Sequence, residues 1–305
     1  MIQDRSDARL RYLYERAQRL ESSRHRLTRL TGKRTIQRFV QRVDASLRGY
    51  PLEMQGGENL PRTGPGIISA VHQDGDDVTL VLESAYSATG RVISPLVEID
   101  TGQTRLESLT LEMLDVTWAM RGAEELAKRR QREAYEEMLA KAQSGHLLAV
   151  WSEGTFCPRF DDVLRLYTGG SVRLPKQYYE LTGEKLLNYP EVTAYEFDES
   201  GRIRAAHVQY LEPFDAMAQG AANDLALAAE RLRQVLKTGK KALYAKYMPN
   251  LTPEQYARFR AAGHRRHPRD PDYYDCGQYA LDYRLAEDSG DQTMMAEIFA
   301  QFADA

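Results

Sequence analysis

The feature that most constrains this chain is a pair of short apolar runs, each bounded by turn-forming residues and each followed by a polar motif. The first run, Ile67 to Val71, comes after the glycine- and proline-rich stretch 56–66, and the second, residues 147–151, comes after Gly145. Runs of this kind are typical of strands buried on both faces. Together with the helical periodicity between them, they predict an α/β fold in which a mostly parallel mixed sheet is flanked by helices.

Hydrophobic spacing also predicts the remaining elements. Helices are expected over residues 78–86, 105–120, 123–142 and 214–237. Further strands are expected over residues 92–97, 193–197 and 204–211, the last two paired across a turn at 198–201. Thr252 and Pro253 have the pattern of a helix N-terminus, and terminal helices are expected at 277–287 and 291–303.

Charge and periodicity divide the chain into three regions. Residues 1–50 form a basic amphipathic helical segment, 51–212 form the core, and 213–305 form a helical region expected to pack on that core. The first region holds 13 lysines and arginines against 5 aspartates and glutamates, a balance of +8 in a chain of net charge −3. Such a segment suits an anionic membrane surface or an acidic carrier protein, although a solvated arginine-rich helix face explains it equally well.

The composition indicates no membrane-spanning helix and no secreted disulfide scaffold. No stretch reaches the roughly eighteen apolar residues that a span requires, and the first residues lack the apolar segment of a secretory signal. The two cysteines, Cys157 and Cys276, cannot form a disulfide framework. We therefore expect a cytoplasmic protein that can act peripherally at a membrane.

Each apolar run ends in residues that can carry chemistry. His72 follows the first run and Asp77 starts the next helix, with Gly75 between them to allow a tight bend. An imidazole held by a carboxylate can remove a proton from an acceptor hydroxyl. Residues 151–155, Trp-Ser-Glu-Gly-Thr, end the second run. Since ligand sites in such sheets form at the carboxyl ends of strands, we expect these two motifs to lie side by side.

The segments 52–72 and 145–155 resemble the catalytic block of the glycerol-3-phosphate and lysophosphatidic acid acyltransferase family, and the resemblance covers about residues 52–211. It implies transfer of a fatty acyl group from acyl-CoA or acyl carrier protein to a hydroxyl of glycerol 3-phosphate or a lysophospholipid. The thioester is then a co-substrate, and no resident cofactor is implied. His72 would be the general base and Asp77 its orienting partner, whereas the acceptor would be bound by Glu153, Gly154 and Thr155.

Three positions depart from the family pattern. Val71 stands where the family usually has asparagine, Ser152 where it has proline, and Phe156 where an arginine often follows the Glu-Gly-Thr motif. A phosphate contact would therefore have to come from Arg159, Arg91 or Arg121. The same chemistry on a non-phosphate hydroxyl or amine acceptor remains an alternative, as does a lipid-binding protein of this fold that has lost turnover.

Other reactive residues favour structural roles. Cys157 is close to the second motif, but a small buried apolar residue is the expected role. His264, His267 and Cys276 could suggest zinc, yet the arginines at 265 and 266 would repel a cation, so we expect no metal. The acidic balance and the lack of a recognised module argue against a nucleic-acid partner.

Overall fold

The computed structural model describes residues 14–15, 49–73, 77–98, 115–120, 125–154, 157, 159–263, 289–290 and 293–294. Within these residues the strands are β1 (Leu52–Gln55), β2 (Gly66–Ala70), β3 (Ile93–Glu98), β4 (Thr117–Ala119), β5 (Leu147–Val150), β6 (Asn188–Phe197) and β7 (Ile203–Tyr210). The α-helices are α3 (Asp77–Thr89), α5 (Glu125–Gln143), α6 (Leu174–Thr182), α7 (Leu225–Tyr247) and α8 (Pro253–Gly263). A short 3₁₀ turn, η1 (Gly57–Asn59), and two π-helical turns, η2 (Gly169–Arg173) and η3 (Met217–Ala221), connect them.

The described strands form one seven-stranded sheet in the order β1-β7-β6-β2-β5-β3-β4. Neighbouring strands run parallel except β6 and β7, which are antiparallel. The expected mostly parallel mixed sheet, with its hairpin after residue 188, is therefore confirmed.

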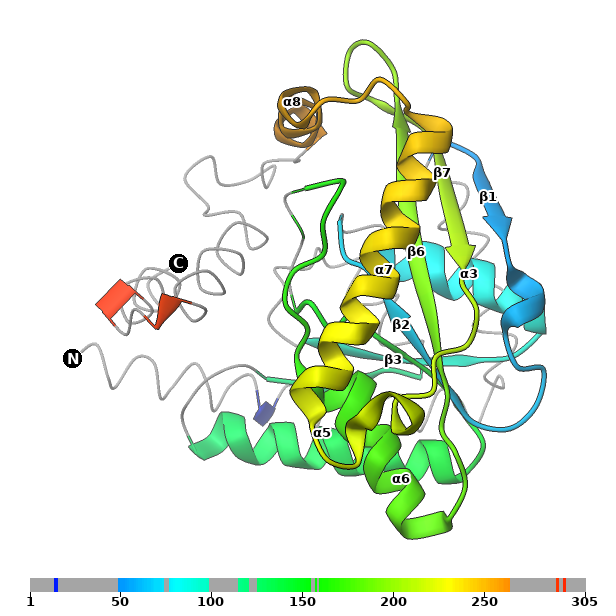
Figure 1. Ribbon diagram of the computed structural model, residues 1–305, viewed down its shortest axis with the longest axis vertical. Coiled ribbons are helices and arrows are strands. Elements are labelled where there is room, and N and C mark those ends of the chain that lie inside the picture. Colours follow the sequence, from blue (N-terminus) through cyan, green and yellow to red (C-terminus); the bar gives the residue numbers. More distant parts are fainter. Residues whose placement is uncertain are drawn as a thin grey trace.

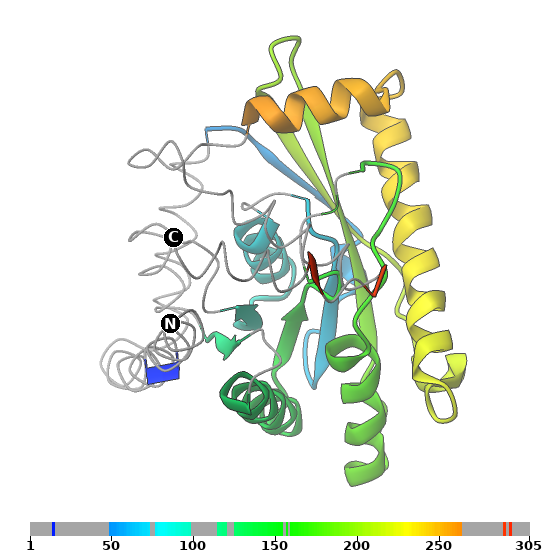
Figure 2. The same cartoon turned by 90° about the vertical axis from the view of Figure 1, so that its left-hand side faces the viewer.

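Helices cover both faces of the sheet, and α3 and α7 lie on opposite sides of it (Figures 1 and 2). Alternate residues of β2 serve the two faces, because successive side chains of a strand point in opposite directions. Ile68 and Ala70 belong to the core under α3, whereas Ile67 packs with Met138 of α5 and Val71 lies in the core under α7. Both faces are thus buried, which explains the continuous apolar run in the sequence.

One expected helix is partly a strand. Within the expected helix 105–120, the structure describes residues 115–120, and Thr117–Ala119 form β4, parallel to β3. Thr117 and Trp118 are buried there, and β-branched and aromatic residues suit such a position. The apolar spacing was compatible with a helix, but pairing with β3 decided the conformation of this segment.

The helix expected at 214–237 begins later and extends further than the sequence indicated. Helix α7 starts after Asp224, whose side chain accepts a hydrogen bond from the Leu227 amide at 3.0 Å. This N-cap satisfies one of the unpaired amides at the helix start. Before it, η3 contains Gly220 with φ of 95°, a left-handed conformation that favours glycine and separates the two segments.

Two elements were not anticipated: strand β1, in a segment too short to show periodicity, and helix α6. The expected terminal helices at 277–287 and 291–303 lie largely outside the described residues, as does most of the basic segment 1–50. None of the helices in the described part of the chain has the length and apolar character needed to span a membrane.

Candidate active site

The two sequence motifs meet at one edge of the sheet. Strands β2 and β5 are parallel neighbours, with Ser69 opposite Val150. His72 lies just beyond the end of β2, and Glu153 lies just beyond the end of β5. The backbone amide of His72 donates to Oε1 of Glu153 at 2.9 Å. The structure therefore brings together two loops that are 81 residues apart in the sequence.

His72 is paired with Asp77 at this edge. The distance between His72 Nδ1 and Asp77 Oδ2 is 3.1 Å, and the Asp77 side chain is fully buried while that of His72 is 17 % exposed. Asp77 Oδ2 also accepts from the Gln73 amide, and Oδ1 accepts from the Tyr195 hydroxyl. The Trp151 ring lies beside the imidazole, with 6.1 Å between the ring centroids. A partly exposed imidazole is thus held on its Nδ1 side by a buried carboxylate.

Glu153 connects the two loops from inside the protein. It is fully buried. Its carboxylate accepts from the His72 amide through Oε1 and from the Leu164 amide through Oε2, at 2.9 and 2.7 Å. Burial raises the pKa of Glu153, while the Lys240 charge and the two amides act in the opposite direction. In this arrangement Glu153 positions the histidine loop, and its direct contact with an acceptor stays a prediction.

Gly154 gives the second loop its turn. Its φ is 73°, and its amide donates to the Trp151 carbonyl at 2.9 Å. A side chain would be strained in this left-handed conformation, so the glycine serves a backbone turn. Thr155 and Arg121, both expected to contact the acceptor, lie outside the described residues.

Of the two candidate arginines that the structure describes, Arg159 is on the site's side of the sheet and Arg91 is not. Arg91 precedes β3, and its guanidinium donates to the carbonyls of Pro61, Gly64 and Gly145. These carbonyls precede β2 and β5, so Arg91 lies at the amino edge of the sheet, opposite His72. The structure thus places Arg91 away from the His72 loop, and a phosphate contact through it stays a prediction. Arg159 follows β5 and is 59 % exposed, paired with Asp161 at 3.0 Å.

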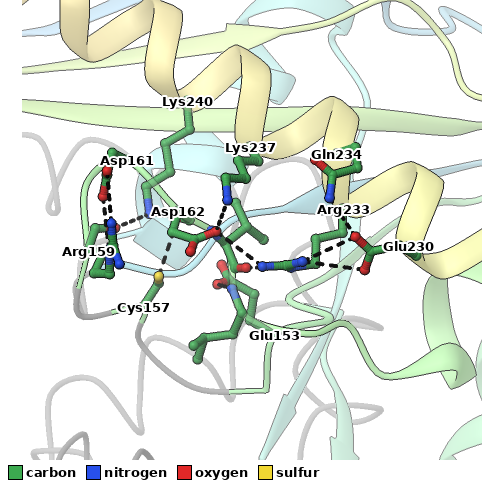
Figure 3. A network of polar contacts seen from close by, with 12 residues as sticks. Glu153, Cys157, Arg159, Asp161, Asp162, Glu230, Arg233, Gln234, Lys237 and Lys240 are labelled. Atoms are coloured by element: carbon green, nitrogen blue, oxygen red, sulfur yellow. Dashed lines mark hydrogen bonds and ion pairs between the residues drawn. The ribbon is translucent and has the colours of Figure 1, made fainter.

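Three cations of helix α7 hold the loop that follows Glu153 (Figure 3). Lys240 is fully buried and donates to the carbonyls of Arg159 and Asp162 at 2.8 and 2.9 Å. Lys237 and Arg233 both pair with Asp162, at 2.9 and 3.2 Å. Arg233 also donates to the Val163 carbonyl at 2.6 Å. The sequence did not single out these residues, although their spacing places them on one face of a helix.

Buried tyrosines support the histidine loop, and they too were missed. The Gln73 side chain accepts from Tyr244 and Tyr256 at 2.7 and 3.1 Å and donates to the Thr193 carbonyl. Helices α7 and α8 therefore reach the residue next to His72. Nothing local in the sequence indicates where a buried tyrosine hydroxyl points, so these contacts could not be predicted from it.

Cys157 does not have the environment of a nucleophile. Cys157 is 1 % exposed, and its thiol donates to the Asp162 carbonyl at 3.4 Å. Burial raises the pKa of Cys157 to about 11, so the thiol is protonated at neutral pH. Its backbone amide donates to the His72 carbonyl at 2.7 Å, which ties the two loops together a second time. These contacts agree with the expected structural role.

Comparison with known proteins extends to the fold. No family model matches the sequence, and no curated protein sequence matches it. Among solved structures, the chain is similar to the crystal structure of the 1-acyl-sn-glycerophosphate (LPA) acyltransferase PlsC from Thermotoga maritima. The two share 17 % sequence identity with a TM-score of 0.52, over 80 % of this chain and 98 % of that chain. The chain therefore has the fold of an acyltransferase of known structure.

Proposed function

We propose that this protein is an acyltransferase that moves a fatty acyl group from a thioester to a hydroxyl group. The observation that carries the proposal is the contact of 3.1 Å between His72 Nδ1 and the buried Asp77 carboxylate, at the strand edge where Glu153 meets the same loop. A histidine held in this way can use Nε2 as a general base. The likeness of the fold to an LPA acyltransferase supports the same chemistry.

The reaction needs one proton transfer in each direction. His72 Nε2 takes the proton of the acceptor hydroxyl as its oxygen attacks the thioester carbonyl, and Asp77 stabilises the resulting imidazolium. The tetrahedral intermediate then collapses, the carbon–sulfur bond breaks, and the thiolate leaves with the proton returned by His72. The products are an ester and a free thiol, with no covalent enzyme intermediate.

The proposal extends to the chemical identity of the acceptor and of the donor. We propose glycerol 3-phosphate or a lysophospholipid as the acceptor, and acyl-CoA or acyl carrier protein as the donor, because the motifs resemble those of that family. Phe156, in place of an arginine, permits the alternative of a non-phosphate hydroxyl or amine acceptor. Mass spectrometry of products from a panel of thioesters and acceptors separates the two, since only one class of acceptor should gain the acyl mass.

Changing His72→Ala should lower kcat by about two to four orders of magnitude, because the general base is lost. Asp77→Asn should also cause a large loss of rate with little change in folding, because the histidine then loses its charged partner. Product formation with the best donor and acceptor from the panel, together with thermal unfolding, measures both effects.

His146 offers a matched control, because it is a half-buried histidine at the opposite edge of the sheet, where its Nδ1 contacts the Lys141 carbonyl at 2.9 Å. His146→Ala should leave kcat unchanged. Equal rates for His72→Ala and the unmodified protein would reject the general-base role. A folded protein that transfers no acyl group to any acceptor would favour a lipid-binding protein without turnover.

A further inference from the structure

Two buried tyrosines of the sheet form hydrogen bonds to helix α3. One of the two, Tyr195, bonds to Asp77. Tyr195 of β6 is 2 % exposed, and its hydroxyl donates to Asp77 Oδ1. Tyr210 of β7 is 1 % exposed, and its hydroxyl contacts the Ser84 hydroxyl at 2.7 Å and the Val81 carbonyl at 3.1 Å. Both therefore bond to α3, but Tyr195 bonds to the carboxylate that faces His72.

The Tyr195 hydroxyl bonds to the Asp77 carboxylate oxygen other than the one that faces His72. Asp77 Oδ2 faces His72 Nδ1 and the Gln73 amide, whereas Oδ1 receives the tyrosine. A carboxylate bonded through both oxygens keeps its plane in one orientation. A donor on Oδ1 also draws negative charge away from Oδ2, which is the oxygen that stabilises a protonated imidazole.

We propose that Tyr195 is a positioning residue for His72, acting through Asp77 by fixing the carboxylate plane and moderating the charge that the imidazole meets. This role rests on the proposed function, because His72 transfers a proton only if the protein is an acyltransferase of that kind. Tyr195, which is 118 positions from Asp77 in the sequence, thus joins His72 and Asp77 in the candidate site.

Two other titratable groups respond to the Asp77 charge, and burial disfavours the charged form of each. Glu191 of β6 is fully buried, and its pKa is raised well above its usual value by burial and by the Asp77 charge. Burial also raises the pKa of Tyr244, from α7, well above its usual value. Lys240 of α7 contributes a positive charge on the Glu153 and Glu191 side. A change in how Tyr195 meets Asp77 should therefore be seen mainly in the titration of His72.

The test follows the His72 imidazole by NMR across pH in the full-length protein, with its signal assigned by loss in His72→Gln. In Tyr195→Phe more negative charge stays on the oxygen that faces the ring, so the titration midpoint should rise by about half a pH unit or more. Tyr210→Phe is the matched control: it removes a buried hydroxyl from the same face of the sheet and should leave the midpoint unchanged. Equal midpoints in Tyr195→Phe and the unmodified protein, or equal shifts in both variants, would overturn the proposal.

A second replacement shifts the titration in the opposite direction with little change in side-chain volume. 3-Fluorotyrosine at position 195 keeps the hydroxyl but makes it a stronger donor, so the midpoint should fall. An unchanged midpoint here would also count against the role. Neither NMR measurement needs substrate. If the protein transfers no acyl group, the proposed function is refuted, but the two titrations still test the role of Tyr195. Where transfer is observed, Tyr195→Phe should lower kcat about tenfold with KM unchanged.

Discussion

The two flanks of the candidate site stabilise their carboxylates with different chemistry. On the α3 flank, Asp77 accepts hydrogen bonds from the neutral Gln73 amide and Tyr195 hydroxyl and contacts the imidazole of His72. On the α7 flank, the loop after Glu153 is held by the cations Arg233, Lys237 and Lys240 (Figure 3).

The difference separates two tasks. A carboxylate stabilises a protonated imidazole most strongly if no other cation lies beside it, so neutral hydrogen-bond donors suit its remaining positions. A loop that only has to stay in place can be fixed by charge, because cations bond strongly to carbonyl and carboxylate oxygens. We infer that the α3 flank adjusts proton transfer and that the α7 flank fixes geometry.

The largest expected change in the free energy of unfolding is at Lys240. Lys240→Met removes the buried cation that bonds two loop carbonyls and acts on buried Glu153. Removing one partner from a buried group of charges typically costs about 3–5 kcal/mol, so urea denaturation should show a loss of that order.

Lys241 is the matched control, because it is the next residue on α7 and is exposed. Lys241→Met should change the free energy of unfolding by less than about 0.5 kcal/mol. Equal stabilities for the two variants would break the comparison, since the loop would then not depend on buried charge.

A smaller, pH-dependent effect is expected at Glu191. Its Oε1 accepts from Thr193 at 2.5 Å, and its Oε2 has no hydrogen-bond partner among the described residues. Its folded-state pKa is raised above the ordinary value of 4.5, mainly by burial. Above the unfolded-state pKa, folding must therefore take up a proton, and this contribution to stability falls as pH rises towards the folded-state pKa.

Glu191→Gln abolishes that titration, so the variant should gain stability relative to the unmodified protein as pH rises, by at most about 1.4 kcal/mol per pH unit. Urea denaturation at pH 5, 6, 7 and 8 measures the difference. Glu199→Gln, at an exposed turn on the same hairpin, should leave the pH dependence unchanged. Parallel curves for Glu191→Gln and the unmodified protein would show that Glu191 is charged in the folded state, and the α3 flank would then not be neutral.

The smallest effect concerns Arg159, the exposed cation of the α7-held loop. If the acceptor carries a phosphate, Arg159→Gln should raise the KM for that acceptor by about tenfold or less, with kcat unchanged. Arg91→Gln is the control, because Arg91 is at the amino edge and bonds backbone carbonyls there. Initial rates at several acceptor concentrations would show the difference. An unchanged KM for Arg159→Gln would assign the loop a purely structural role.

The sequence predicted the part of the site that depends on strand ends. His72 and Glu153 follow short buried runs, and parallel neighbours end at the same edge, so their proximity was foreseeable. The position of Arg91 was foreseeable too, because a residue that directly precedes a parallel strand lies at the amino edge.

The supporting residues could not be predicted in the same way. Tyr195 and Lys240 lie on strand β6 and helix α7, and their periodicity indicated only that they face the interior. Whether a buried hydroxyl meets Asp77 or a backbone carbonyl depends on strand register and on how the helices pack over the sheet. Strand β4 was missed for a related reason, since its pairing with β3 outweighed its local spacing.

The sequence alone determined the α/β alternation, the order of the two motifs and the presence of a histidine and a carboxylate at one strand end, because these follow from spacing along the chain. The tertiary structure alone decided which groups surround Asp77 and Glu153. A hydrogen bond forms only when donor and acceptor are within about 3 Å of each other. Between residues 118 positions apart, as Tyr195 and Asp77 are, that distance is set by the packing of the whole sheet and its helices.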